Sequence, residues 1–591
     1  MVKEEIINAL KEAVHEVTGV EVEPEVFKSA DERHGDYSTN VAMAVFGNKE
    51  LGIKNQGWKT PLELAQSIVE IFNSKFIIHN SFIDHVDVVN PGFINFWLSS
   101  DYLITQLQEV LEQKEQFGTT SKSSISGNKI MVEFAHPNTH KEMHIGHMRT
   151  LITGEALARI LKLQGAKVFR ANYQGDIGPH VAKALFGIKK IMEEEKLSLN
   201  EIEKWTAQDK VHFLGRGYIR GNQDYEENKE EIEKLNTELY KKESKDWDLY
   251  LKTRQWSLDY YDEFYTRFYT KFDRLFFESE MVECGKKIVE ENIGKVFVKD
   301  QGAVIFKGEE YGLHTRVFIT KAGNPTYEGK DMCLGFKEYE AFSFDKNIHV
   351  VGSEQAGYFK VIIKALELLD PQKFKGTQYH LSMGMVNIVG MKISSRTGEI
   401  LRVDTLIEKV KEKVESLMKE GKIAVEGKEK VLEQITIGAI KYSVLKVNAE
   451  QNVEFDIEKS VSIEGNSGPY LQYTYARTQS VLAKYKELSI KYKELNWKFE
   501  IGNLKLEIEE LSLLRSINQF TEVVSEAAEK LSPNLLANYL FDLSQKFNLF
   551  YQKHKIIESE KQDLRVAVTN ATGQILKNGL YLLGIEAPER M

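Results

Sequence analysis

The sequence predicts a multidomain protein with a parallel α/β domain at its centre, an α+β domain before it and an all-α domain after it. Three observations predict this architecture. The chain has 591 residues, which is too long for one hydrophobic core and enough for roughly three to four domains. Its middle part alternates apolar strands with helices, which favours a parallel sheet with right-handed crossovers. Its last third shows almost only helical periodicity.

The first domain is expected to span residues 1–116 as a small α+β unit. Apolar periodicity predicts helices over 3–17, 61–74 and 101–115 and a strand near 83–89. The stretch ERHGDYSTN is expected to form a loop. The segment FGTTSKSSISGN, 117–128, has the Ser, Gly and Thr content of a linker and therefore marks the first domain boundary.

The second domain is expected to span residues 129–402. KIMVEF predicts a strand, 146–163 a helix and KVFRANY a second strand, and the alternation returns with NIHVVG, a helix over 354–369 and the apolar stretch 377–389. Residues 186–275 between these halves are rich in Glu, Lys, Trp and Tyr at helical spacing, so they predict a helical insertion.

The third domain is expected to span residues 403–591 as an all-α bundle. PNLLANYLFDLSQKFNLFYQ and LRVAVTNATGQILKNGLYLLGIEAP have the apolar stripes of packed bundle helices. The sequence shows no internal repeat and no low-complexity tract.

Composition narrows the functional classes. With 42% hydrophobic and 28% charged residues and ten prolines, the chain is expected to fold throughout. No apolar run approaches the roughly 18 residues that cross a bilayer, and the N-terminus resembles an amphipathic helix, so we expect a cytoplasmic protein. The formal net charge of -10 argues against a protein that coats nucleic acid indiscriminately.

The two cysteines, Cys284 and Cys333, lie 49 positions apart in unlike contexts. They offer neither a disulfide framework nor a multi-cysteine metal site. We expect both to be core or neutral thiols.

Four of the 14 histidines fall within HPNTHKEMHIGHMRT, residues 136–150. The spacing invites a zinc interpretation, but Pro137 disfavours a helix at His136 and no recognised ligand pattern is completed, so no metal site is predicted. His144 and His147 instead open a helix after an apolar strand. A helix N-terminus attracts phosphate, and Gly146 permits close approach of a nucleotide. Ordinary core or solvated histidines remain the alternative, and His136 and His140 stay unexplained.

A second candidate element is GMVNIVGMKISSRTGEI, 384–400, which alone could be a polar turn. HIGH followed by KISSR resembles the two signature motifs of class I aminoacyl-tRNA synthetases. The resemblance implies a Rossmann-like sheet that binds ATP, with Mg²⁺ accompanying the nucleotide. It places His144, Gly146 and His147 at the adenine and phosphates and Lys392 and Ser394 over the triphosphate.

Further strings resemble the arginyl-tRNA synthetases along nearly the whole chain. HGDYSTNVAM and PGFINF resemble their N-terminal domain, VEFAHPNTHKEMHIGHMRT their extended first motif, and SGPYLQYTYART and NGLYLLGIEAPERM their anticodon-binding domain. The resemblance implies formation of arginyl-adenylate from arginine and ATP, then transfer of arginine to the 3′ end of tRNA(Arg) with release of AMP and pyrophosphate. The protein is expected to be a monomer.

An arginine pocket should hold the planar guanidinium between carboxylates and reject lysine. In PTYEGKDMCLG, Tyr327 and Asp331 lie four residues apart and share a face if a helix begins there, as we expect. The resemblance implies that these two contact the guanidinium with Glu278 as a second carboxylate. It implies that Asn138 and Gln355 hold the α-amino and carboxylate groups.

The chain departs from the family pattern in three places. Lys330 replaces a usual arginine, GDIGPHVAKALFG replaces a Gly-Asp-Trp-Gly string, and Ser395 replaces the second lysine of the KISSR motif. Relatives that share the last change have a lysine before HIGH, and Lys141 lies there. Our hypothesis is that Lys141 restores the missing charge, so that Lys141→Ala lowers the rate by roughly 10² or more.

The resemblance also implies tRNA contacts. Single-stranded bases often stack on aromatic planes. Tyr470, Tyr473 and Tyr551 match aromatic residues on the anticodon side, and Phe93 and Asn95 match a contact of the first domain with the tRNA D-loop. Aromatic residues at helical spacing are also ordinary core residues, which is the alternative for Tyr551.

Three other interpretations stay open on the sequence alone. They are a class I synthetase for another amino acid, a nucleotidyltransferase that does not use RNA, and a tRNA-binding paralogue without catalytic activity. The helical last third disfavours the second of these, and the complete set of site residues disfavours the third.

Overall fold

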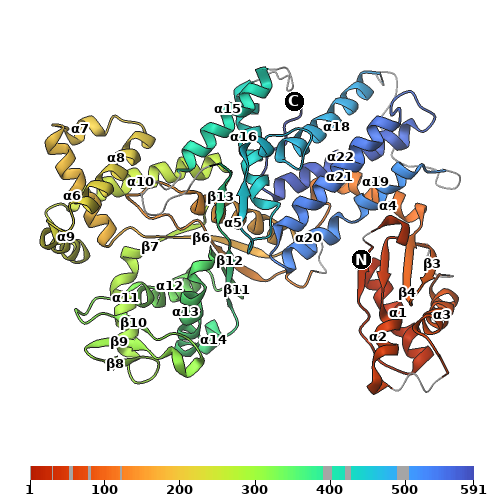
Figure 1. Cartoon of the computed structure of the whole chain (residues 1–591), viewed down its shortest axis with the longest axis horizontal. Coiled ribbons are helices and arrows are strands. Elements are labelled where there is room, and N and C mark those ends of the chain that lie inside the picture. Colours follow the sequence, from red (N-terminus) through yellow and green to blue (C-terminus); the bar gives the residue numbers. More distant parts are fainter. Residues whose placement is uncertain are drawn as a thin grey trace.

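The computed structural model describes residues 2–29, 31–51, 57–77, 82–119, 123–390, 402–419, 428–488 and 505–591. The N-terminal lobe lies at one end of an elongated molecule, below the C-terminal helices, and the helices of the insertion lie at the opposite end (Figure 1). The parallel sheet lies between them. In the part of the chain so described, no helix has the length and apolar character needed to cross a membrane.

The N-terminal lobe is an antiparallel sheet packed with helices. Its strand order is β1-β2-β4-β3, formed by β1 (Val26–Lys28), β2 (Tyr37–Thr39), β3 (Ile83–Val89) and β4 (Phe93–Leu98). The helices are α1 (Val2–Thr18), α2 (Val41–Gly47), α3 (Pro61–Phe72) and α4 (Ser100–Gln113). The predicted helices and strand are confirmed. The predicted loop ERHGDYSTN is wrong in part, because β2 lies within it and pairs with both β1 and β4.

The central sheet has five parallel strands in the order β12-β11-β5-β6-β7. They are β5 (Lys129–Glu133), β6 (Lys167–Gln174), β7 (Arg274–Phe277), β11 (Lys346–Gly352) and β12 (Gln378–Met383). α5 (Ile145–Leu163) joins β5 to β6, and α13 (Ala356–Leu369) joins β11 to β12, as predicted. In parallel strands all carboxyl ends meet at one edge, so the loops after β5, β6 and β11 lie together.

Five helices between β6 and β7 form the insertion. They are α6 (Pro179–Glu194), α7 (Leu199–Ile202), α8 (Ala207–Gln223), α9 (Lys229–Lys241) and α10 (Trp247–Arg267). A Cβ at Gly187 would overlap the backbone of Gly217, so glycine lets α6 and α8 pack almost backbone to backbone. The helical character predicted from periodicity is confirmed, and the helices already begin at Pro179.

A small substructure follows β7, and the sequence predicted only one part of it, the helix that begins at Tyr327. It consists of α11 (Glu278–Glu291), the antiparallel strands β8 (Val298–Asp300), β9 (Ala303–Phe306) and β10 (Arg316–Ile319), then α12 (Tyr327–Ala341) and, after α13, α14 (Pro371–Phe374). The prediction of two separate thiols is wrong. Cys284 on α11 and Cys333 on α12 form a disulfide with their Cα atoms 5.6 Å apart, because the packing of α11 on α12 brings them together.

Over 402–419, 428–488 and 505–591, the elements of the C-terminal part are helices and one short strand. Its helices are α15 (Val403–Lys419), α16 (Lys428–Leu445), α17 (Ile457–Ser460), α18 (Gly468–Leu488), α19 (Ile508–Asn518), α20 (Phe520–Glu529), α21 (Pro533–Lys553) and α22 (Gln562–Leu582). The exception is β14 (Val453–Phe455), which pairs in parallel with β13 (Val386–Ile388) after the central sheet. Three residues are too few to show a periodicity, so the sequence did not reveal this link.

Candidate active site

The loop between β5 and α5 contains an unusual backbone. Ala135, His136 and His140 have φ values of 81°, 54° and 63°, in the left-handed region that residues with a side chain rarely adopt. Such residues persist where surrounding contacts hold them. The loop lies at the carboxyl edge of the sheet, where its residues His136 and Asn138 line a cavity.

His144 caps the N-terminus of α5, as the motif predicts. Its Nδ1 accepts hydrogen bonds from the backbone N–H groups of Gly146 (3.1 Å) and His147 (3.4 Å), and the Nδ1 of His147 accepts one from the backbone of His144 (3.5 Å). The two rings stack with centroids 3.6 Å apart. Because both Nδ1 atoms are acceptors, each neutral ring carries its proton on Nε2 and can donate it to a ligand.

Both rings are neutral at physiological pH. Burial and the nearby Lys141 ammonium lower the pKa of His144 to about 4. Burial and the His144 ring hold the pKa of His147 well below its usual range. These imidazoles are therefore uncharged hydrogen-bond donors, and the positive charge of this loop comes from Lys141.

The structure describes only part of the second predicted motif, 384–400. Lys392, Ser394 and Ser395 lie outside the described residues. The chain on their C-terminal side returns to the histidine loop, where the backbone of His144 bridges to Arg402 and Val403 donates to the carbonyl of Met143 at 3.2 Å. The chain that follows the second motif therefore contacts the first motif through Arg402 and Val403.

All five predicted arginine-binding residues line one cavity of about 520 Å³ at the carboxyl edge of the sheet. These are Asn138, Glu278, Tyr327, Asp331 and Gln355. Tyr327 is the first residue of α12, and it is 54% exposed. The cavity wall carries five carboxylates against one arginine, Arg316, which suits a cationic ligand.

Gly175, at the end of β6, allows the close approach of two of these residues. A Cβ at this position would overlap the amide of Asn138 and would lie 3.1 Å from the carboxylate of Glu278. The next residue, Asp176, is fully buried and accepts bonds from the backbone N–H and hydroxyl of Ser279 at 2.8 and 2.7 Å. Although GDIGPHVAKALFG differs from the family string, it keeps the Gly-Asp pair. Both residues of the pair, Gly175 and Asp176, have a structural role here.

The two predicted carboxylates of the cavity differ. Asp331 accepts a 2.7 Å hydrogen bond from the Tyr358 hydroxyl, and burial raises its pKa to about 7. Glu278 is 2% exposed and already forms an ion pair with Lys330. Burial lowers the pKa of Lys330, but Glu278 and Tyr240 offset this effect, and the pKa is raised overall. Asp331 is thus the better placed of the two for a free guanidinium.

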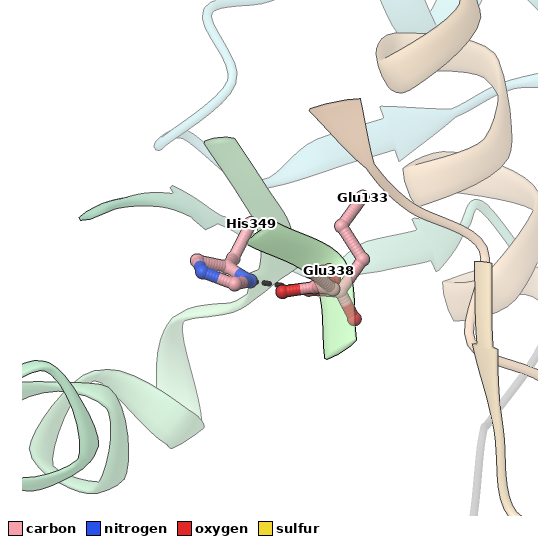
Figure 2. A group of neighbouring side chains, drawn as sticks. All are labelled: Glu133, Glu338 and His349. Atoms are coloured by element: carbon pink, nitrogen blue, oxygen red, sulfur yellow. Dashed lines mark hydrogen bonds and ion pairs between the residues drawn. The ribbon is translucent and has the colours of Figure 1, made fainter. Parts of the chain in front are cut away.

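A buried polar cluster that the sequence did not predict lies beside the cavity. Figure 2 shows the His349 imidazole and the carboxylates of Glu133 and Glu338 turned toward one another. His349 binds Glu133 through Nδ1 and approaches Gln378 through Nε2 at 2.7 Å. The spacing of the three side chains could suit a metal ion, but both nitrogens of His349 are already engaged.

The signal for this cluster was present in the sequence. Glu133 interrupts the apolar strand KIMVEF, and His349 interrupts the apolar strand NIHVVG. The two residues are direct partners across β5 and β11. Only the strand order reveals that pairing. The other cavity residues missed from the sequence are His136, Tyr173, Arg316, Glu328, Leu334, Val351, Glu354, Tyr358 and Phe359.

The structure accounts for the two unexplained histidines. His140 is fully buried, with Nε2 2.8 Å from the hydroxyl of Thr253, and burial lowers its pKa to about 3. His136 lines the cavity, and its Nδ1 lies 3.4 Å from Glu133. His140 is thus a structural residue of the loop, whereas His136 belongs to the cavity wall.

A second cavity, of about 560 Å³, lies between α18 and α21 and contains two of the predicted anticodon-side residues. Tyr473 and Tyr551 hold the guanidinium of Arg477 between their rings, at 4.8 and 4.9 Å from the ring centroids. Tyr551 is 42% exposed. Tyr470 instead packs on Phe541 with ring centroids 5.5 Å apart. Its hydroxyl accepts a hydrogen bond from Asn548.

The two predicted D-loop contacts differ in exposure. Phe93 is half-buried at the start of β4. Asn95 is 2% exposed and accepts a 2.6 Å hydrogen bond from Ser38 within the sheet. In this conformation Phe93 can meet a ligand, whereas the Asn95 side chain supports the lobe from inside.

Comparison with known protein families agrees with this arrangement. Residues 106–457 match the model for the catalytic domain of class I (R) tRNA synthetases, residues 471–591 the DALR anticodon-binding domain, and residues 2–98 the arginyl-tRNA synthetase N-terminal domain. The arginine--tRNA ligase of Borreliella afzelii is 33% identical over 548 residues, which cover 89% of each chain. That of Borrelia garinii subsp. bavariensis is 34% identical and covers 88% of each.

The fold is similarly matched by solved structures. The Thermus thermophilus arginyl-tRNA synthetase superimposes with a TM-score of 0.80 at 23% identity, covering 100% of both chains. The family models and the relatives together cover all three parts of the chain. The chain therefore belongs to the arginyl-tRNA synthetases of class I, and it uses ATP to activate arginine and to charge tRNA with it.

Proposed function

We propose that the cavity at the carboxyl edge of the sheet is the arginine pocket. Asp331 and Tyr327 contact the guanidinium, and Asn138 and Gln355 hold the α-amino and carboxylate groups. Glu278 adds a second negative charge that Lys330 partly neutralises. The observation that carries this proposal is the convergence of all five residues on one cavity with an acidic wall.

We propose that ATP binds beside this pocket, at the N-terminus of α5. His144 and His147 donate from Nε2 to the phosphates, and Gly146, which is exposed, leaves room for the nucleotide. Lys141, with Lys392 and Ser394 of the second motif, supplies the remaining contacts. Mg²⁺ enters with ATP as part of the substrate, so no protein ligands are assigned to it.

In the proposed reaction the arginine carboxylate attacks the α-phosphorus in line and pyrophosphate leaves. Charge on the phosphate oxygens grows in the transition state, and preorganised donors stabilise it without reorganisation. The neutral imidazoles and the Lys141 ammonium are such donors. The 3′ end of tRNA then attacks the arginyl group, and AMP is released.

Charging of tRNA with labelled arginine, lysine and glutamate in parallel tests this assignment. We expect arginine alone to be transferred, and Lys141→Ala is expected to lower the rate by roughly 10² or more. Transfer of lysine at a comparable rate would contradict the proposed pocket. Unchanged turnover in Lys141→Ala would contradict the role of that lysine and leave the pocket unaffected.

We propose that the tyrosine pair on α18 and α21 receives an anticodon-loop base, which would take a place beside Arg477 between the two rings. A stacked base contributes about 1–3 kcal/mol, so Tyr551→Ala is expected to raise the KM for tRNA by roughly fivefold or more. The KM for ATP should stay unchanged. An unaltered KM for tRNA would remove Tyr551 from the interface.

We further propose three domains with the expected bounds 1–116, 129–402 and 403–591, with 186–275 as the insertion. Phe93 provides a contact for the tRNA D-loop from the first domain, and Asn95 supports it from within the sheet. We propose that the protein is a monomer and that it works in the cytoplasm. Sedimentation of the free protein and of its tRNA complex would test the monomer.

A further inference from the structure

One face of α10 in the insertion holds the loop that carries Asn138 and Lys141. Thr253, Ser257 and Tyr261 are spaced four residues apart, so they form one stripe along the helix. The Tyr261 hydroxyl donates to the carbonyls of Asn138 (2.6 Å) and Lys141 (2.8 Å). The other two residues of the stripe, Ser257 and Thr253, bind His140, which precedes Lys141.

His140 is fixed at both its backbone and its ring. Its backbone N–H donates to the Ser257 hydroxyl at 2.9 Å, and its Nε2 lies 2.8 Å from the Thr253 hydroxyl. The neighbouring Thr139 backbone N–H donates to the carbonyl of Gly175 at 2.9 Å. Because the φ of His140 is 63°, the backbone needs these contacts to keep a conformation that would otherwise be disfavoured.

The same helix also holds the segment after β6 on which Asn138 packs. Arg254 donates from Nε to Asp176 at 2.8 Å, and the hydroxyl of Tyr250 donates to the same carboxylate at 3.4 Å. Asp176 follows Gly175, on which the Asn138 amide packs, and binds Ser279 beside Glu278. α10 therefore sets the position of Asn138 from two sides.

We propose that α10 is a positioning element for arginine activation, in which Tyr261, Ser257 and Thr253 hold Asn138 and Lys141 at their working distances. This inference rests on the proposed roles of Asn138 and Lys141. It gives the insertion a function in catalysis, since the insertion contains the only described groups that bind the carbonyls of both residues. The three side chains touch the loop and not the substrate, so they act through it.

The test is Tyr261→Phe, which removes the two hydrogen bonds and keeps the buried ring. Small displacements of positioned groups cost up to about 10²-fold in rate, so we expect kcat for arginyl-adenylate formation to fall between about tenfold and 10²-fold. The KM for ATP should change little. Arginine-dependent exchange of pyrophosphate into ATP, with tRNA present at saturation, measures both quantities. Ser257→Ala and Thr253→Val should lower kcat in the same direction.

Tyr442→Phe is the matched control. Tyr442 lies on α16, among the C-terminal helices, and is also fully buried. Its hydroxyl donates to Asn466 at 2.6 Å and to the carbonyl of Ala537 at 3.2 Å. Its loss should lower the melting temperature about as much as Tyr261→Phe does and leave kcat unchanged. An equal fall of kcat in both variants would overturn the inference, because general loosening would then explain the effect.

A double-mutant cycle separates this inference from the proposed function. If Tyr261 acts through the loop, Tyr261→Phe should cost much less in a Lys141→Ala or Asn138→Ala background than in the wild type. Equal costs in all backgrounds would overturn the positioning role while the proposed site survives. If Lys141→Ala and Asn138→Ala each leave kcat and KM unchanged, the proposed site and this inference both fail.

Discussion

Among the side chains of the active site, Asp331 has the charge that depends most clearly on its environment. Burial raises its pKa to about 7, although the Tyr358 hydroxyl acts in the opposite direction. Glu133, His349 and Glu278 surround it with mixed charge. An acid with this pKa is largely protonated in slightly acidic solution, and it must lose that proton to bind a guanidinium.

The KM for arginine is therefore expected to fall as pH rises toward about 7 and to level off above it. At lower pH the loss of affinity approaches about tenfold per pH unit, because one proton must be released for each arginine bound. The KM for arginine in pyrophosphate exchange, measured between about pH 6 and pH 9, tests this expectation. In Tyr358→Phe the carboxylate loses a donor, so the fall in KM should move to higher pH. A KM that does not vary over this range would contradict the assignment.

At the scale of elements, Arg149 connects α5 to the junction with the C-terminal helices. Its side chain is 2% exposed, and its hydrogen bonds to the described residues go to backbone carbonyls. Its Nη1 donates to the carbonyl of Met385 (2.7 Å), and its Nη2 to those of Ala449 (2.9 Å) and Gln451 (2.5 Å). One residue thus joins the signature helix to the segments that directly precede β13 and β14.

Replacement of Arg149 by Met should leave the carbonyl of Gln451 without its donor, whereas the carbonyls of Met385 and Ala449 keep the backbone N–H groups of Val453 and Gly384. An unsatisfied buried group costs about 1–3 kcal/mol, so we expect the free energy of unfolding to fall by roughly that amount. The effect is measured by comparing the calorimetric melting temperature of Arg149→Met with that of a control variant, Arg33→Met. The Arg33 side chain is 86% exposed and pairs with nearby Asp31, so its loss should be close to neutral. Equal melting temperatures for the two variants would contradict the role of Arg149.

At the scale of the whole molecule, Lys441 connects three distant parts of the chain. It lies on α16 and donates from Nζ to the carbonyls of Phe268, after α10, and of Gly584, near the C-terminus, each at 2.6 Å. Burial, with the nearby Arg159 charge, lowers its pKa to about 7 from an ordinary 10.5. Between these two values the unfolded chain holds a proton that the folded chain has released.

The stability of the wild type relative to Lys441→Met is therefore expected to rise as pH increases from about 7 toward 10. The unfolded state binds more protons in this window, and stability rises with pH wherever that is so. Below about pH 7 both states are protonated, and the full cost of burying the charge remains. Urea unfolding at several pH values compares the two proteins. Stability curves that stay parallel from pH 7 to pH 9 would contradict the assigned pKa shift.

The sequence by itself determined the class of fold, the helical insertion and the helix that begins at HIGH, because these depend on local periodicity and on capping residues. It also named Asn138, Glu278, Tyr327, Asp331 and Gln355, which line one cavity, although the family resemblance supplied this set. Their roles are still proposals.

Only the tertiary structure decided which partners these residues have. The pairing of Glu278 with Lys330, the His349–Glu133 contact and the Cys284–Cys333 disulfide join segments separated by dozens to hundreds of residues. No local pattern encodes such contacts, because they arise from strand order and helix packing. For the same reason His140, unexplained in the sequence, and Tyr261, to which the sequence assigned no role, become the support of the loop that carries Asn138 and Lys141.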